Sequence, residues 1–157
     1  MNTIENKLKA MGYTLPPPFT FPKNNRTGCT QIGNLLLLSG HGLDLPKLPG
    51  VRQTGKFGVD ISEEEGYATA RAVALTMLAS IKQEIGSLDK VKQVIRLFGM
   101  CNAAPDYAKM PQVIDGASDL FFELFGPTAG CHARTAVGMA ALPRGIAVEI
   151  NGEFEVS

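Results

Sequence analysis

The spacing of apolar residues along the chain divides it into helical and extended segments. Apolar residues three and four positions apart predict three helices: residues 3–11, 62–86 and 111–126. Shorter apolar or alternating runs predict strands in four places: residues 29–32, 34–39, 91–101 and 132–150. Pairs of strands therefore flank a β-α-β-α segment. This order favours an α+β domain, with two helices covering one face of a mixed sheet and an N-terminal helix beside them.

The ends of the predicted helices carry recognisable signals. Thr3 is a plausible cap of the first helix, and Gly12 would end it. Ser62 and Glu65 have the spacing of a capping box at the start of the second helix. Pro111 suits the first turn of the third. These signals agree with the apolar spacing and fix the predicted boundaries.

Turn residues indicate how the strands connect. Gly33-Asn34 is typical of a tight hairpin turn between the first two strands. The Gly- and Pro-rich stretch that follows predicts a long loop with a short strand near Lys56–Val59. Within residues 132–150, Pro143-Arg144-Gly145 predicts a turn joining two strands, and 153–156 forms a short tail. We expect about six strands in total.

Composition narrows the class of protein. A length of 157 residues favours a single domain, and 15 basic against 15 acidic residues give no net charge to attract nucleic acid or an anionic membrane. The longest apolar run is too short to span a bilayer, and no signal peptide opens the chain. Three widely spaced cysteines suit neither a disulfide framework nor a zinc site and suggest a cytoplasmic location. We expect a small ligand.

The strand that contains Arg134 is the most informative segment. Counting by twos from Arg134, its face carries Ala136, Gly138 and Ala140, so a long cation is followed by nearly bare backbone. Such a column suits either a tight packing partner or a small anionic ligand. A structural ion pair is the plainer interpretation of Arg134.

Two further residues near this segment are candidates for chemistry. Glu149 is a suitable general base, although alternation between Val148 and Ile150 also predicts a residue that simply faces solvent. His132 lies two residues before Arg134, so it either borders the same cleft or is ordinary polar surface.

Several motifs together resemble a known family. They are Asn34-Leu-Leu-Leu-Leu-Ser-Gly40, the Glu-rich helix start, Gly116-Ala-Ser-Asp-Leu120 and the Arg134 strand with its Leu-Pro turn. In this order they resemble the Rid proteins, the reactive intermediate deaminases. These proteins are also called YjgF-like and were formerly labelled L-PSP endoribonucleases. The likeness is closest to a longer subgroup with an N-terminal extension. Residues 1–157 would then form a single domain, in which 1–27 are an N-terminal helix and a Pro-rich arm and 28–157 are the core.

The resemblance implies a fold, an assembly and an activity. It implies a chorismate-mutase-like fold assembled as a homotrimer, with ligand sites in the clefts between subunits. The implied reaction is hydrolysis of small 2-imino acids, formed from enamines such as 2-aminoacrylate, to 2-keto acids and ammonia without metal or cofactor. Arg134 would hold the substrate carboxylate and Glu149 would orient the attacking water, while Gly40 and Ala136 would line the pocket.

The chain departs from the family pattern at four positions. The position of the family's pocket tyrosine falls near Arg26, so Arg26 or Phe19 is expected to supply that wall. The cysteine often found in the family is Ala136 here, a glutamate is replaced by Gly138, and Asp115 stands where asparagine is usual.

The sequence leaves three candidate functions. The first is an imine/enamine deaminase, the second a non-catalytic trimer that binds small carboxylates as a sensor, and the last an endoribonuclease.

Overall fold

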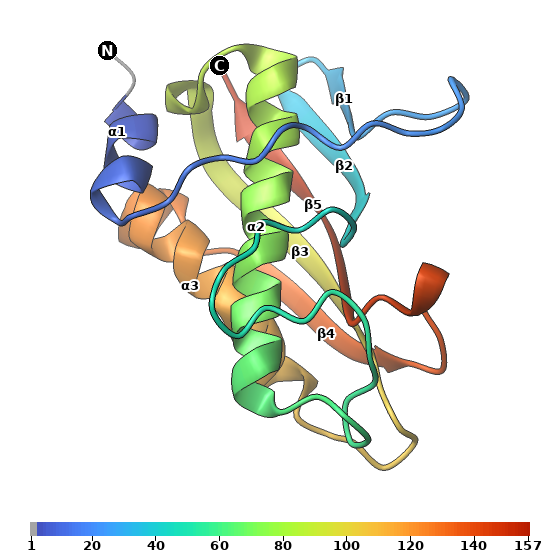
Figure 1. The fold of residues 1–157 in the computed structure, drawn as a ribbon. Helices are drawn as coiled ribbons and strands as arrows, with labels where there is room; N and C mark the ends of the chain where they lie inside the picture. The colour runs from blue at the N-terminus through green and yellow to red at the C-terminus, as the bar shows by residue number, and fades with distance from the viewer. Residues whose placement is uncertain (1–2) are drawn as a thin grey trace.

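The computed structural model describes residues 3–157 and contains one mixed five-stranded sheet (Figure 1). Its strands are β1 (Cys29–Ile32), β2 (Leu35–His41), β3 (Val91–Asn102), β4 (Ala133–Met139) and β5 (Val148–Val156). Their order across the sheet is β1-β2-β5-β3-β4, and every neighbouring pair is antiparallel except β3 with β4. The predicted α+β class with a mixed sheet is confirmed.

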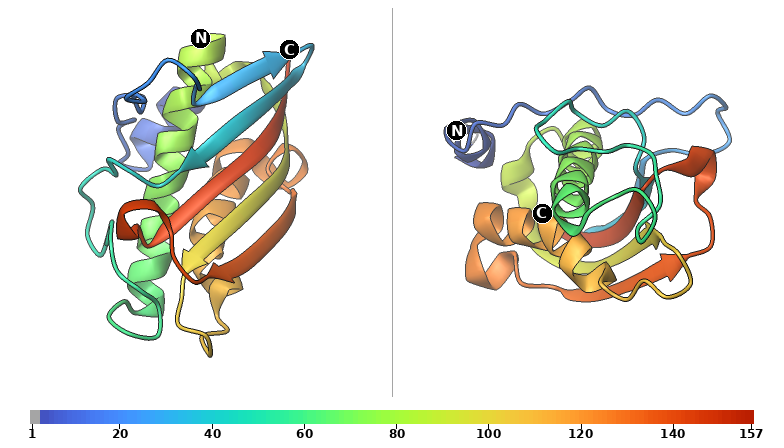
Figure 2. Two further views of the ribbon diagram at one scale, coloured as in Figure 1. Left: turned by 90° about the vertical axis from the view of Figure 1, so that its right-hand side faces the viewer. Right: turned by 60° about the horizontal axis from the view of Figure 1, so that its bottom comes forward.

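Helices pack on one face of this sheet, as Figure 2 shows. They are α1 (Thr3–Ala10), α2 (Glu63–Ile85) and α3 (Met110–Ala129), with single 3₁₀ turns η1 (Leu88–Lys90) and η2 (Pro143–Gly145). The expected sixth strand is absent from the described residues 3–157, because around Lys56–Val59 only Phe57 makes isolated bridges, to Ile61 and Ala103. The sheet therefore has five strands rather than about six.

The predicted signal at the start of the helix holds for α2 but not for α1. Ser62 and Glu65 form the capping box reciprocally, with hydrogen bonds of 3.1 and 3.0 Å, and Gly86 ends the helix at φ 84°. Thr3, in contrast, lies inside α1 rather than before it. The backbone N–H groups of Thr3 and Ile4 donate to the Asp89 carboxylate at 2.8 Å each. A side chain 85 residues away in the sequence thus caps α1, which local spacing could not reveal.

The predicted pairing of the last two strands is wrong. β4 and β5 are not neighbours, because β3 lies between them and pairs with both: Leu97 faces Arg134 of β4 on one side and Gly152 of β5 on the other. The Pro143–Gly145 turn therefore carries the chain across the end of β3. The predicted tail 153–156 is the second half of β5.

The two faces of the sheet differ in what covers them. Val148, Ile150 and Phe154 of β5 are fully buried in the main core beneath α2 and α3. The opposite face, which we call the open face, carries a smaller cluster of Met100, Leu142 and Ile146 against partly buried neighbours. No helix covers it in the described part of the chain (Figure 2). The open face therefore keeps apolar surface exposed to solvent.

The packing of α2 on α3 depends on a glycine. A Cβ at Gly116 would collide with the backbone carbonyl of Tyr67, an atom that no side-chain rotation can move. We expect Gly116→Ala to destabilise the protein by about 2 kcal/mol or more. Gln112→Ala, an exposed change on the same helix, should stay within about 0.5 kcal/mol. Urea unfolding of both variants checks this, and equal midpoints would contradict it.

Candidate functional site

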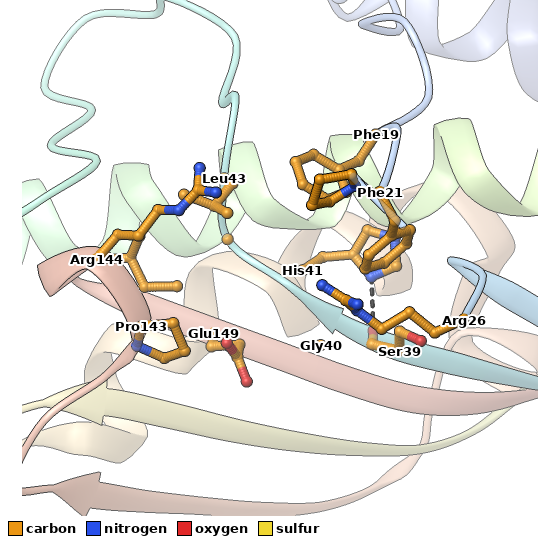
Figure 3. Close-up of a pocket in the computed structure, with 13 residues that line it drawn as sticks. Phe19, Phe21, Arg26, Ser39, Gly40, His41, Leu43, Pro143, Arg144 and Glu149 are labelled. Atoms are coloured by element: carbon orange, nitrogen blue, oxygen red, sulfur yellow. Dashed lines mark hydrogen bonds between the residues drawn. The ribbon is translucent and has the colours of Figure 1, made fainter. Parts of the chain in front are cut away.

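A pocket of about 390 Å³ lies where the N-terminal arm crosses the end of β2 (Figure 3). Its wall comes from the arm through Phe19, Phe21 and Arg26, and its floor comes from Ser39, Gly40 and His41 at the end of β2. The turn η2 and the start of β5 close the other side, through Pro143, Arg144, Ile146 and Glu149. Segments far apart in sequence thus meet at one concave site, the usual form of a small-molecule pocket.

The floor of the pocket is a β-bulge. Leu38 pairs with Gly152 and His41 with Ile150, so three steps along β2 match two along β5. The extra residue lies at Ser39–Gly40, opposite Asn151, and the Glu149 side chain lies against Gly40. A Cβ at position 40 would lie 2.6 Å from Glu149 Oε2, so only glycine lets the carboxylate lie against this backbone. Gly40 thus lies at the site where the sequence predicted a pocket.

Glu149 is an unpaired carboxylate in this pocket. Its neighbours Val148 and Ile150 are buried on the helix side, which places Glu149 on the open face. Partial burial raises its pKa above the ordinary value of 4.5. Within residues 3–157 no hydrogen bond or ion pair engages this carboxylate, so its oxygens are available as acceptors for a water molecule or ligand.

His41 borders the same pocket, but both of its ring nitrogens are occupied. Nδ1–H donates to the Ser39 carbonyl at 2.6 Å, which leaves Nε2 to accept from Ser80 Oγ at 2.8 Å. The residue is only 4% exposed, and burial lowers its pKa. His41 is therefore a neutral support that ties the bulge to α2.

The arm presents a cation held by aromatic rings. The Arg26 guanidinium stacks over Phe21 at 5.0 Å, and Phe19 meets Phe21 edge-on with ring centroids 4.9 Å apart. Arg26 also donates to Asn25 Oδ1 at 2.9 Å. Arg26 and Phe19 thus line the pocket that contains Glu149, and their contact with a ligand stays a prediction.

The sequence did not single out Arg144 as a pocket residue. It is exposed, but it lines the pocket from the side opposite the arm (Figure 3). Its backbone is left-handed at φ 57°, and Gly145 beside it has φ 69°. The Pro-Arg-Gly triplet was a usable turn signal, but it says nothing about which pocket the arginine reaches.

Arg134 lies in a second, shallower pocket of about 320 Å³ against α3. Its Nη1 donates to Asp115 Oδ1 at 2.7 Å and to Ser118 Oγ at 3.2 Å. His132 Nε2 accepts from the same hydroxyl at 2.9 Å, and its Nδ1–H donates to the Gly130 carbonyl. Arg134 and His132 thus line the same cleft, which is the arrangement expected from their spacing of two residues. An ion pair with Asp115 is also present, as the plainer interpretation required.

Arg134 and Glu149 of one chain do not meet. Arg134 pairs with Leu97 of the main core and so faces the helix side, whereas Glu149 pairs with Met100 on the open face. The two residues lie three positions along and two strands across, which puts their Cα atoms about 14 Å apart at the usual strand spacings. Ala136 packs beside the main core and lines neither pocket.

The described residues contain neither a clustered metal site nor a membrane-spanning helix, and their cysteines are free. Among residues 3–157 no group of three potential metal-ligating side chains is gathered. Over the same range no helix is long and apolar enough to cross a membrane. The three cysteines are free, and burial raises the pKa of Cys29 and Cys101 to about 12.

Comparisons with known proteins extend over nearly the whole chain. Residues 5–147 match the family model described as "YjgF/chorismate mutase-like, putative endoribonuclease". The protein TCP17 of Trypanosoma cruzi is 38% identical, covering 98% of this chain and 94% of its own. The Agrobacterium tumefaciens protein Atu1372, of unknown function, has a TM-score of 0.85 at 37% identity, covering 99% of this chain and 94% of its own. A "putative endoribonuclease" from Shewanella oneidensis has a TM-score of 0.87 at 33% identity, covering 99% of this chain and 100% of its own.

The buried neutral His41 predicts how stability depends on pH. Its pKa in the folded state is below the ordinary value of 6.5, so between the two values the unfolded chain binds the extra proton. We expect the free energy of unfolding to fall as pH drops below about 6.5, by at most about 1.4 kcal/mol per pH unit for this residue.

Urea unfolding between pH 8 and pH 5 measures this dependence. His41→Asn should be less stable than the parent at pH 8, because its two hydrogen bonds are lost. Its stability should nevertheless decline less steeply toward pH 5. Burial also lowers the pKa of His132, so His132→Gln provides a background in which the slope of His41 is isolated. An unchanged slope in His41→Asn would contradict the prediction.

Proposed function

Because this chain belongs to the YjgF/chorismate-mutase-like family, we propose that it is an imine/enamine deaminase. Its substrates are small 2-imino acids, which water converts to 2-keto acids and ammonia. The free Glu149 carboxylate in the bulge-floored pocket is the observation that carries the proposal, since this hydrolysis needs one positioned acceptor for a proton of water.

The reaction balances with the side chains of the pocket. Glu149 accepts a proton from water while the water oxygen attacks the C=N carbon, and it then passes this proton to the nitrogen. Glu149 next transfers the hydroxyl proton of the resulting carbinolamine to the amine, so that the C–N bond breaks and ammonia leaves as the C=O bond of the keto acid forms. One imine and one water thus give one keto acid and one ammonia. The partly buried carboxylate, with its raised pKa, is a stronger base than an exposed one.

The substrate carboxylate needs a cation, and we propose that Arg134 of a neighbouring subunit supplies it. Both recorded hydrogen bonds of Arg134 come from Nη1, which leaves the Nε–Nη2 edge for a second carboxylate. Because Arg134 and Glu149 face opposite sides of one sheet, only a second copy of the chain can bring such a pair together. Leu37 on the open face is 42% exposed, which supports association through that face into a homotrimer. The free cysteines suit a cytoplasmic location.

The endoribonuclease description of the family gives a second candidate. Phe19, Phe21 and Arg26 combine aromatic rings with a cation, as surfaces for single-stranded nucleic acid do. This candidate requires degradation of RNA by protein freed of contaminating nuclease, with the activity lost in Glu149→Gln. Persistence of any RNA cleavage in that variant would identify it as contamination.

We expect Glu149→Gln to lower kcat/KM for imine hydrolysis by about 10² to 10⁴, the usual contribution of a general base. Imines generated in place by an amino-acid oxidase are the substrate, and keto-acid release is the measurement. Glu155→Gln is the matched control, because Glu155 lies on the same face of β5 outside the pocket. The acid limb of the parent's pH profile should lie above pH 4.5. Full activity of Glu149→Gln would overturn the proposal.

Mixed oligomers test where the arginine comes from. Arg134→Ala and Glu149→Gln should each be inactive alone. If each site takes Arg134 from one subunit and Glu149 from the next, random reassembly of an equal mixture should recover about a quarter of the parent activity. No recovery after verified subunit exchange would overturn the assignment of Arg134 to a neighbouring subunit. Arg134-dependent binding of 2-ketobutyrate without turnover by the parent protein would favour the carboxylate sensor instead.

A further inference from the structure

We propose that the pocket selects 2-imino acids whose side chain ends in a second carboxylate, and that Arg26 and Arg144 receive this group. The inference rests on the proposed function and names its substrate class. Four of the chain's six arginines, Arg52, Arg71, Arg96 and Arg134, each pair with a carboxylate. Within residues 3–157, the two that form no ion pair both line this pocket.

The charge of the pocket lining therefore favours an acidic ligand. It contains two guanidinium groups and one carboxylate, that of Glu149, while His41 is neutral with both ring nitrogens occupied. Glu149 is hydrogen-bonded to neither arginine, so it does not neutralise them in place. A ligand that brings a carboxylate into this space would meet unpaired cations.

Arg26 is held in position to receive such a group. One face of its guanidinium covers Phe21, Phe19 braces that ring, and Asn25 accepts from Nη1. Figure 3 shows the guanidinium pointing inward over Gly40, from the side of the pocket opposite Arg144. The aromatic rings therefore support a cation rather than offer a free apolar wall, and the planar fork of Arg26 matches the geometry of a carboxylate.

Arg144 is held in a backbone conformation that arginine rarely adopts. A left-handed φ of 57° costs about 1–2 kcal/mol for a residue with a Cβ. The turn is nevertheless fixed, because Gly55 N–H donates to the Gly145 carbonyl at 3.0 Å and Ala147 N–H to the Gln53 carbonyl at 2.9 Å. Strain of this kind concentrates at functional sites. Here it places a second guanidinium on the rim.

Under this proposal the three arginines contact different groups of the substrate. The α-carboxylate is assigned to Arg134 of a neighbouring subunit, and Glu149 serves the water. Arg26 and Arg144 then have no role with an apolar substrate such as the imine of leucine. With the imine of glutamate or aspartate, the side-chain carboxylate supplies the partner that they lack.

The test compares imines generated in place by oxidases from glutamate, aspartate and leucine. The parent protein should accelerate hydrolysis of an acidic imine at least about tenfold more than that of the leucine imine, since charge-assisted hydrogen bonds are among the stronger polar contacts. Arg26→Gln and Arg144→Gln should each lower this acidic-to-leucine ratio several-fold, and Arg26→Lys should restore part of it. Raising the salt concentration should also lower the ratio.

Lys23→Gln is the matched control, because it removes one positive charge from the arm at an exposed position that does not line the pocket. It should leave the ratio at the parent value. Equal acceleration of all three imines, with a ratio unmoved by Arg26→Gln, would overturn this inference and leave the deaminase proposal intact.

Absence of acceleration with every imine would overturn the deaminase proposal instead. Calorimetric titration then decides the inference separately. 2-Oxoglutarate should bind more tightly than 4-methyl-2-oxopentanoate, and Arg26→Gln should abolish that difference. Equal affinities for the two acids would overturn the inference in that case as well.

Discussion

The alternation of β5 is the constraint on which the rest of the structure depends. Val148, Ile150, Phe154 and Val156 must all enter the core beneath α2 and α3, so the alternate residues Glu149, Asn151, Glu153 and Glu155 face the other way. Glu149 is therefore on the open face because its neighbours are buried, whatever its own chemistry. The same rule in β4 sends Arg134 to the helix side. Core packing alone thus separates the two groups that the proposed chemistry needs, and this separation is the reason we propose a second subunit as part of the site.

Local signals in the sequence were sufficient for most of the elements. The capping box of α2, the Gly33-Asn34 turn and the apolar run of β3 are each determined by residues a few positions apart. Strand order was not, because it depends on contacts between distant segments. A short turn favours a hairpin between β4 and β5, but β3 offers both of them a longer buried partner. The capping of α1 by Asp89 was invisible for the same reason.

The candidate site, like the fold, was only partly predictable from the sequence. Family motifs pointed to Gly40, Glu149 and the arm residues, and these do line one pocket. The motifs could not show that Arg134 lies elsewhere, since a linear pattern does not say which face of the sheet each strand presents. Arg144 was predictable only as a turn residue, because its place in the pocket depends on a left-handed backbone and on the path of the chain across β3. Residue types were predictable, and their meeting in space was not.

The bulge in β2 has a consequence for how such a site can change over evolution. Two residues, Ser39 and Gly40, occupy the length that one would fill, and His41 still reaches the core side to meet Ser80. The floor beneath Glu149 is thus made of main chain. Drift in side chains around it can alter which molecules enter while the floor persists. A single-codon deletion in this stretch would remove the floor at once, so the site depends on the number of residues here as well as on glycine at position 40.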